Sequence, residues 1–223
     1  MIAIAIDGPA GAGKSTIARL TAKKLGYLYV DTGALYRTVG YAAKLRGIDP
    51  GDAQQVAAML PEIAVDLSFD KDGVQQTLLN GQDVSGQIRS PEMSRYASQV
   101  SAHKAVREYL LWLQRKLAQE HNVIMDGRDI GTTVLPHADL KIYLTATPED
   151  RARRRFDEYL SKGVSVDYDK LLNDIKQRDY DDSHREISPL RRAEDAKLVD
   201  TSGNTLEESL ELMEAMIRRH LGI

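Results

Sequence analysis

The sequence predicts an α/β fold in which helices cover both faces of a doubly wound, five-stranded parallel sheet. Short, continuously apolar runs such as IAIAI (residues 2–6) alternate with longer helical segments along the chain. Strands that are buried on both faces have this composition. The alternation is interrupted once, between residues 63 and 84, where the pattern indicates a small antiparallel β insert.

Composition narrows the class of protein. The 223 residues are 42% hydrophobic and 28% charged, which is typical of one globular domain with a proper core. The net charge of −3 argues against a nucleic-acid-binding protein. Cysteine is absent, so disulfides and thiolate chemistry are excluded. No apolar run is long enough for a membrane span or a signal peptide, and we therefore expect a cytoplasmic protein.

The first half of the chain begins with the strand at 2–6, followed by a helix that stops at Gly26. A second strand at 27–31 leads into a helix that ends at Gly47. Asp49 and Pro50 then predict the N-cap and first turn of a short helix that stops before Pro61.

The insert and the segment after it complete this half. IAVDLSF alternates in polarity, DKDG (residues 70–73) predicts a turn, and Asn80-Gly81 predicts a second turn after the run VQQTLL. These features indicate an antiparallel meander. A single long helix is predicted over about residues 91–121.

The second half resumes the parallel pattern with strands at 122–126, 139–146 and 197–202. Thr147 and Asp150 predict a capping box for a helix that ends near Gly163, and another helix begins at Asp167. Thr205 and Glu208 predict a capping box for the last helix. Its predicted core-facing stripe is Leu206, Leu210, Met213, Ile217 and Leu221.

The loop GPAGAGKS, between the first strand and the first helix, has the spacing G-x-x-x-x-G-K-[ST] of a phosphate-binding loop. Its backbone N–H groups and the helix N-terminus suit phosphate oxygens. Lys14 would reach the β- and γ-phosphates of ATP, and the Ser15 hydroxyl would ligate Mg²⁺. Strand, loop and helix in register make a chance glycine-rich turn a poor alternative. The predicted ATP-binding residues are Gly8, Pro9, Ala10, Gly11, Ala12, Gly13, Lys14, Ser15 and Thr16.

Other features narrow the reaction. The chain lacks the N-K-x-D motif of guanine-specific switches, and it is short for a motor or chaperone-type ATPase. A kinase of small metabolites fits better. VIMD ends in Asp126, as a Walker B strand does, so Asp126 is a second candidate Mg²⁺ residue. A strand-end acid without a metal role remains the alternative.

The stretch DRARRRF places four arginines in five positions, at 151, 153, 154 and 155. Like charges three or four residues apart cost a helix roughly 0.2–0.5 kcal/mol per pair, and cations near a helix N-terminus are badly placed. A bound anion would explain the cluster. At about 100° per residue, Arg154 and Arg155 should share a helix face with Arg151, whereas Arg153 should lie about 160° away from it. A solvated basic face is the alternative.

Several motifs, DTGALYR, DGRDIGT, QRDYDDSHR and ASQVSAHKAVR, together with DVSGQIRS in the insert, closely resemble those of the bacterial cytidylate kinase family of P-loop NTPases. The resemblance runs from the first strand to about Asp200. Thr32 stands where serine is also common, and Ser15-Thr16 where glycine can precede threonine.

The resemblance implies transfer of the ATP γ-phosphoryl group to CMP or dCMP, giving ADP and CDP or dCDP. It places Asp129, with Arg107, Arg185 and Ser98, on the cytosine. Uracil has an acceptor where cytosine has an amino donor, so Asp129 would repel it. The remaining implied substrate residues are Arg178 and Asp182 on the ribose, Arg37 and Arg128 on the acceptor phosphate, and Tyr36 and Thr32 nearby. An exposed helical salt bridge is the alternative for the Arg178–Asp182 pair.

The resemblance also implies one kinase domain, residues 1–223, with a core at 1–60, 91–146 and 190–223. The insert at about 61–90 would be the monophosphate-binding region. A helical lid at about 147–189 would bring Arg151, Arg154 and Arg155 to the migrating phosphoryl group, beside Lys14 and Arg128, while an open lid would leave these arginines in water.

The predicted partners are CMP and dCMP, without nucleic acid or membrane, and the predicted state is a monomer. Two other functions stay open, namely a kinase of another acceptor, such as UMP or a shikimate-like alcohol, and a nucleotide-switched regulatory protein.

Overall fold

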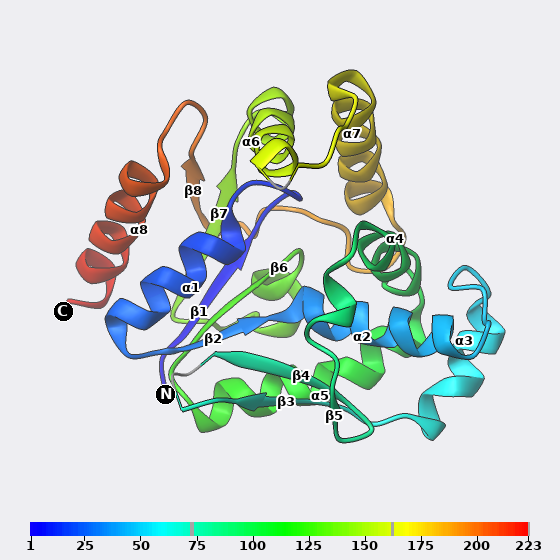
Figure 1. The fold of residues 1–223 in the computed structure, drawn as a ribbon. Helices are drawn as coiled ribbons and strands as arrows, with labels where there is room; N and C mark the ends of the chain where they lie inside the picture. The colour runs from blue at the N-terminus through cyan, green and yellow to red at the C-terminus, as the bar shows by residue number, and fades with distance from the viewer. Residues whose placement is uncertain (72–73, 162, 223) are drawn as a thin grey trace.

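The computed structural model describes residues 1–71, 74–161 and 163–222, and its centre is a parallel sheet. The five strands are β1 (Ala3–Asp7), β2 (Leu28–Asp31), β6 (Val123–Gly127), β7 (Leu140–Thr145) and β8 (Lys197–Asp200). They lie in the order β2-β6-β1-β7-β8, and every neighbouring pair is parallel (Figure 1). The predicted fold class is confirmed.

Helices cover the two faces of this sheet. On one face, α1 (Lys14–Leu25) and α8 (Leu206–Leu221) pack over Ile4 and Ile6 of β1. On the other face, α2 (Thr32–Leu45) and α5 (Lys104–Glu120) pack over Ala5. The alternation along β1 therefore divides the core into two layers. Within the described ranges, no helix has the length and apolar character needed to cross a membrane.

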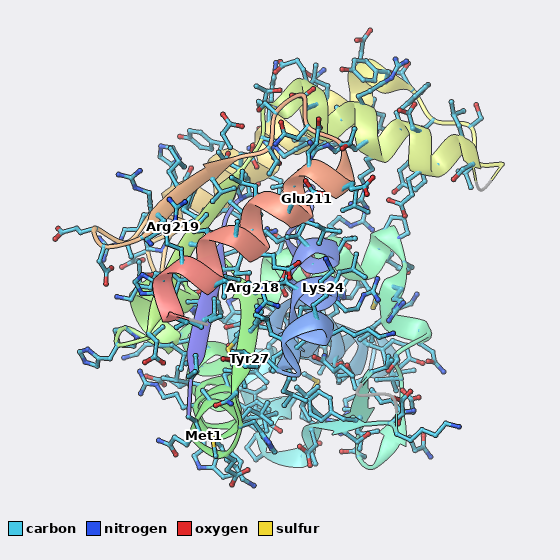
Figure 2. All side chains as sticks on the ribbon, turned by 90° about the vertical axis from the view of Figure 1, so that its left-hand side faces the viewer. Met1, Lys24, Tyr27, Glu211, Arg218 and Arg219 are labelled. Atoms are coloured by element: carbon cyan, nitrogen blue, oxygen red, sulfur yellow. The ribbon has the colours of Figure 1, made fainter. Side chains whose placement is uncertain are left out.

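Helix α8 lies along α1 at the edge of the molecule that Figure 2 turns toward the viewer. Lys24 of α1 bonds Glu214 of α8 at 2.7 Å. Of the predicted stripe, Met213 and Ile217 are fully buried, whereas Leu206 is half exposed and lines a pocket instead. The predicted capping box is confirmed, because the Glu208 N–H donates to Thr205 Oγ1 and the Thr205 N–H donates to the Glu208 carboxylate.

The insert forms the expected antiparallel meander of β3 (Val65–Phe69), β4 (Gln75–Leu79) and β5 (Gln82–Asp83). Asn80 and Gly81 have φ angles of 51° and 80°, as a tight hairpin turn requires. The other predicted turn, at 70–73, includes residues 72 and 73, which lie outside the described residues. The Gln75 side chain accepts a bond of 2.8 Å from the Asp31 N–H, which ties the insert to the end of β2.

The predicted start of the short helix is wrong by three residues. Helix α3 (Ala53–Met59) is capped by Asp52, whose carboxylate accepts from the backbone N–H groups of Gln54 and Gln55. Asp49 instead closes a turn by accepting from the Gly51 N–H at 2.9 Å. Pro61 lies in the 3₁₀ turn η1 (Leu60–Glu62) that follows α3.

The predicted long helix is two helices, α4 (Pro91–Val100) and α5, separated by residues 101–103. The chain tightens as the Ala102 N–H donates to Gln99 O and the His103 N–H donates to Val100 O, both at 3.1 Å. His103 is then extended, with φ −83° and ψ 125°. A short 3₁₀ turn, η2 (Gln87–Arg89), precedes α4.

Helices α6 (Pro148–Ser161) and α7 (Tyr168–His184) lie beside each other after β7 (Figure 1). The predicted capping box of α6 is only half present. The Asp150 N–H donates to Thr147 Oγ1, but the Thr147 N–H donates to Ser202 Oγ at 2.9 Å. The structure also shows a π turn that the sequence did not predict, η3 (Ile130–Val134), directly after Asp129.

Candidate active site

The loops after the carboxyl ends of β1, β2 and β6 converge with α4, α6 and α7 on one cavity of about 600 Å³. Ligands bind at this edge of open α/β sheets. Of the predicted site residues, only Gly8, Pro9 and Ala12 do not line it. Those that do are Ala10, Gly11, Gly13, Lys14, Ser15, Thr16, Thr32, Tyr36, Arg37, Ser98, Arg107, Asp126, Arg128, Asp129, Arg151, Arg154, Arg155, Arg178, Asp182 and Arg185.

The phosphate loop has the backbone that its glycines predict. Gly8 has φ 149°, and a Cβ there would lie 1.9 Å from Leu144 O, so no other residue fits. Gly13, with φ 86°, caps α1 without a side chain, which leaves the first helical N–H groups available. Lys14 is buried and its ammonium donates to Pro9 O at 2.7 Å. Burial, and then the nearby Arg128, lower the pKa of Lys14.

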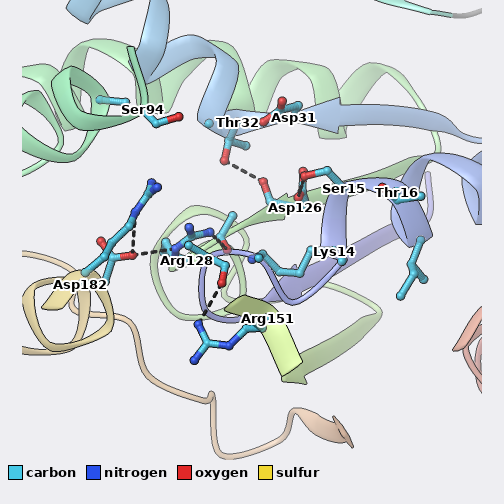
Figure 3. A pocket seen from close by; sticks show the side chains of 18 of the residues that line it. Lys14, Ser15, Thr16, Asp31, Thr32, Ser94, Asp126, Arg128, Arg151 and Asp182 are labelled. Carbon is cyan, nitrogen blue, oxygen red and sulfur yellow. Dashed lines mark hydrogen bonds and ion pairs between the residues drawn. The ribbon is translucent and has the colours of Figure 1, made fainter. Parts of the chain in front are cut away.

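Asp126 ends the apolar part of β6 beside the phosphate loop, and Figure 3 shows it facing Ser15. Ser15 Oγ donates to Asp126 Oδ2 at 2.8 Å, and the Tyr29 hydroxyl donates to Oδ1 at 3.0 Å. Burial, and then Asp31, raise the pKa of Asp126 to about 6. A carboxylate and a hydroxyl are suitable Mg²⁺ ligands, and a cation here would offset the repulsion between the two aspartates. The residues present therefore fit Mg²⁺.

A second cluster, around Asp129, lies at another part of the pocket. The buried Asp129 carboxylate accepts from Arg107 and forms an ion pair of 3.6 Å with Arg185. Arg107 also donates to Ser101 O at 3.2 Å and lies 5.5 Å from the centre of the Tyr36 ring. The break between α4 and α5 supplies that carbonyl. One carboxylate between two guanidinium groups offers both an acceptor and donors to a planar base.

A third cluster joins β6 to α7. Asp182 accepts from Arg128 Nε at 2.9 Å, and its carboxylate lies 4.0 Å from Arg178 Nε (Figure 3). Burial alone would raise the pKa of Asp182, but Arg128 and Arg178 hold it below its ordinary value. The exposed salt bridge considered for Arg178 and Asp182 is thereby excluded, because Asp182 is only 5% exposed.

Several guanidinium nitrogens in this pocket are buried without a hydrogen-bond partner. They are Nε of Arg37, Nε of Arg178 and Nη2 of Arg185. Buried donors are normally satisfied, so unpaired ones in a cavity indicate a ligand with acceptor atoms. Burial, and then Arg128, lower the pKa of Arg178 to about 10, a cost that a bound anion would relieve.

The arginines of α6 differ sharply. Arg153 is 69% exposed, pairs with Asp157 and does not line the pocket, so its predicted separation from the other three is confirmed. Arg154 Nη2 donates to Thr201 O at 2.6 Å, and Arg155 Nη2 to the Tyr159 hydroxyl at 3.3 Å.

Arg151 is only 2% exposed, unlike the solvated arginines that we expect of an open lid. Its guanidinium donates to Ala146 O and Ala10 O, both at 2.9 Å, and to both oxygens of Asp179 at 3.0 and 2.5 Å. It therefore links α6, α7 and the phosphate loop.

Sequence reasoning missed part of the lining. Asp31, Ser94, Ser101 and Glu158 border the pocket, and so does the segment that begins α8. The signal for that segment was its position after a parallel strand, where ligands gather. In that segment, the lining residues are Asn204, Thr205, Leu206 and Ser209.

Charge is concentrated in this pocket. Among the residues that the structure describes, nine cationic and five acidic side chains line it, whereas the whole chain carries a net charge of −3. The cavity is therefore a locally basic site in an acidic protein, as an anionic ligand requires.

Comparison with known proteins decides the family. A family model described as cytidylate kinase matches residues 4–219. The chain belongs to the cytidylate kinase family. A cytidylate kinase from Caldicellulosiruptor bescii is 52% identical over 94% of this chain and 92% of its own length. The cytidylate kinase of Lactobacillus johnsonii is 46% identical over 98% and 95%, and that of Bacillus subtilis 46% over 93% and 92%.

One solved structure supports the fold of this cytidylate kinase family member. An uncharacterized protein from Eubacterium ventriosum matches with a TM-score of 0.54 over 97% of this chain and 98% of that one. Its sequence identity is 12%, so the likeness concerns the fold alone.

Proposed function

We propose that this protein transfers the γ-phosphoryl group of ATP to CMP or dCMP, giving ADP and CDP or dCDP. The observation that carries the proposal is the presence, in one cavity, of a phosphate loop with a buried lysine and a buried carboxylate flanked by two guanidinium groups. The first suits a triphosphate, and the second suits a cytosine.

The base-recognition part rests on complementarity. Cytosine presents an amino donor beside two acceptor atoms. The Asp129 carboxylate accepts from the amino group, and Arg107 and Arg185 donate to the acceptors. Uracil places a carbonyl where cytosine has its amino group, so it faces Asp129 with two acceptors opposed and pays the cost of an unpaired buried group.

The acceptor phosphate is held by Arg37 and Arg128, whose carboxylate partners, Asp31 and Asp182, keep them oriented. Arg178 and Asp182, which lie between these two clusters on the pocket wall in our assignment, hold the ribose. The attacking atom is a phosphate oxygen that is already anionic at neutral pH, so no general base is required. Catalysis then comes from positioning and electrostatic stabilisation.

At the donor end, Lys14 leaves Pro9 O and contacts the β- and γ-phosphates. Ser15 and Asp126 would hold Mg²⁺, which would neutralise phosphate charge when bound. Arg154 and Arg155 line the same cavity and stabilise the transferring group. We assign residues 147–189 to a lid, 61–90 to the insert, and 1–60, 91–146 and 190–223 to the core. Within the lid, Arg151 stabilises the transferring group from its buried position between α7 and the phosphate loop.

We also propose that the protein is a cytoplasmic monomer that acts on small nucleotides and has no nucleic acid or membrane partner. The test of the function is ADP production from ATP and Mg²⁺ with CMP, dCMP, UMP, AMP, GMP and shikimate in parallel. Rapid turnover with CMP and dCMP alone, and little hydrolysis without an acceptor, is the expected result. Equal turnover with UMP, with the alcohol, or without any acceptor would contradict it.

A further inference from the structure

Asp7, the last residue of β1, is buried but does not line the pocket. Its two carboxylate oxygens each accept one backbone N–H from a segment more than a hundred residues away. Oδ1 accepts from Ile130 at 2.7 Å and Oδ2 from Gly131 at 2.8 Å. These are the first N–H groups of η3, which have no partner within the turn itself. Asp7 therefore caps η3 from the centre of the sheet.

The residues directly before η3 are Arg128 and Asp129, the proposed contacts of the acceptor phosphate and the base. Asp129 has φ −144° and ψ 29°, outside the helical and strand regions. Its carbonyl accepts from the N–H groups of Thr133 and Val134 inside η3, at 2.9 and 3.1 Å. The backbone at Asp129 is thus set by the place where η3 begins, and Asp7 fixes that place.

The other end of this segment is fixed as well. Thr32 Oγ1 donates to Asp126 O at 2.8 Å, one residue before Gly127. A Cβ at Gly127 would lie 2.6 Å from Ile130 Cδ1, so the backbone packs without spare room. Between two fixed ends, a shift of η3 has to appear at Arg128 and Asp129.

A carboxylate is suited to this task because both of its oxygens accept. An amide of the same size offers one carbonyl oxygen and an NH₂ group, so one of the two N–H groups would face another donor. Keeping Asp7 ionised in the folded protein costs free energy, because burial raises its pKa to about 6 and the nearby Asp129 raises it further. A neutral side chain would fill the same space without this cost, so the carboxylate is present for its two acceptor oxygens.

We propose that Asp7 is a positioning residue for acceptor recognition: its carboxylate fixes the backbone that presents Arg128 and Asp129, while Asp7 itself contacts neither substrate. This inference rests on the proposed function. A residue that supports the fold generally should affect acceptor and ATP binding alike. Loss of Asp7 should instead weaken acceptor binding and leave ATP binding nearly unchanged.

The test compares Asp7→Asn with Asp52→Asn. Asp52 also accepts from two successive backbone N–H groups, but it caps α3, away from the pocket, and is a matched control. For Asp7→Asn we expect the KM for CMP to rise on the order of 10-fold or more, as misplacement of contact groups does, with the KM for ATP nearly unchanged. The preference for CMP over UMP should narrow. Asp52→Asn should match the parent in all three.

Each outcome separates the inference from the function on which it rests. If the parent does not phosphorylate CMP, the proposed function fails and the inference fails with it. If the parent does so and Asp7→Asn keeps its CMP kinetics and base preference, or raises both KM values equally, only the inference is overturned. Should Asp7→Asn not fold, Asp7→Ser keeps an acceptor that reaches one N–H at most and is judged by the same comparison.

Discussion

At the scale of single residues, Lys14 is a charge that the fold buries before any phosphate arrives. Its ammonium has one hydrogen bond, to Pro9 O, and burial lowers its pKa. Such a group lowers the stability of the folded protein, because the charge of a buried ammonium needs compensation. The compensation is expected from the triphosphate.

Lys14→Met tests this balance, because methionine keeps the volume and removes the charge. We expect turnover with CMP to fall on the order of 10²–10³-fold, as for other donors to a charged transition state. The melting temperature without nucleotide should be equal or higher. Lys23→Met, an exposed change on the same helix, is the control. Near-parental turnover of Lys14→Met would remove the lysine from the chemistry.

Asp129→Asn tests base choice. The change turns an acceptor pair into one acceptor and one donor, and it leaves Arg107 and Arg185 without their carboxylate. We expect kcat/KM for CMP to fall far more than the KM for ATP rises, and the ratio of CMP to UMP use to narrow. Steady-state kinetics with both acceptors measure it. A parallel loss for CMP and UMP would mean that another residue selects the base.

At the scale of elements, α6 carries arginines with distinct duties. Arg153 is solvated, Arg154 and Arg155 border the pocket, and Arg151 is enclosed by α7 and the phosphate loop. Helix periodicity predicted which of them share a face. It could not predict that Arg151 has a carboxylate and two carbonyl groups as partners, because these come from residues distant in sequence.

The four alanine variants of α6 should therefore separate into three classes. Arg153→Ala should resemble the parent. Arg154→Ala and Arg155→Ala should lower kcat on the order of 10–10³-fold with little change in stability. Arg151→Ala should also lower the free energy of unfolding by about 1–3 kcal/mol, because it removes the donor of the Ala10 and Ala146 carbonyls and of the half-buried Asp179. Kinetics and chemical denaturation on all four make the test. A stable Arg151→Ala protein, or a damaged Arg153→Ala protein, would contradict this division.

The strands, the phosphate loop and most helix starts were predictable because their signals are local: apolar runs, glycines at fixed spacing and capping residues. The break at 101–103 was not, because nothing in the residues there stops a helix strongly. One geometric signal was present. Ser98 and Arg107 are nine residues apart, which places them on opposite faces of a continuous helix, yet both were assigned to one base. Only an interrupted helix can present both to the same pocket.

Contacts that join distant segments account for the rest of what the sequence left out. The Asp7 clamp on η3 and the lining from the start of α8 depend on strand order, which β-strand patterns do not specify. Local signals were also ambiguous at Asp49 and Asp52. Aspartate is a good N-cap at either position, and Asp52 is the cap because Asp49 closes the turn that precedes α3.

At the scale of the whole molecule, buried carboxylates make stability depend on pH. The pKa of Asp7 is about 6 in the folded protein, against 3.8 ordinarily. Between these values, the folded protein keeps a proton that the unfolded chain has lost. The contribution of Asp7 to the free energy of unfolding therefore falls as pH rises through this window, by on the order of 3 kcal/mol for a shift of about two units.

Asp7→Asn removes this titration. Denaturant unfolding of the parent and the variant at pH 4.5 and pH 7.5 measures it. The stability of the parent relative to the variant should be greater at pH 4.5 than at pH 7.5. Two curves that stay parallel across the range would show that Asp7 has an ordinary pKa.

The basic cavity within an acidic chain also bears on how substrates arrive. A nucleotide drawn through solution meets repulsion over most of the surface and attraction at one opening, which favours diffusional encounters that are already correctly placed. Added salt weakens this guidance over a Debye length of about 10 Å at 0.1 M. The second-order rate constant for CMP capture should thus decline as ionic strength increases, while kcat at saturation stays nearly level. The acidic surface would thus repel nucleotides from every approach except the one toward the basic pocket.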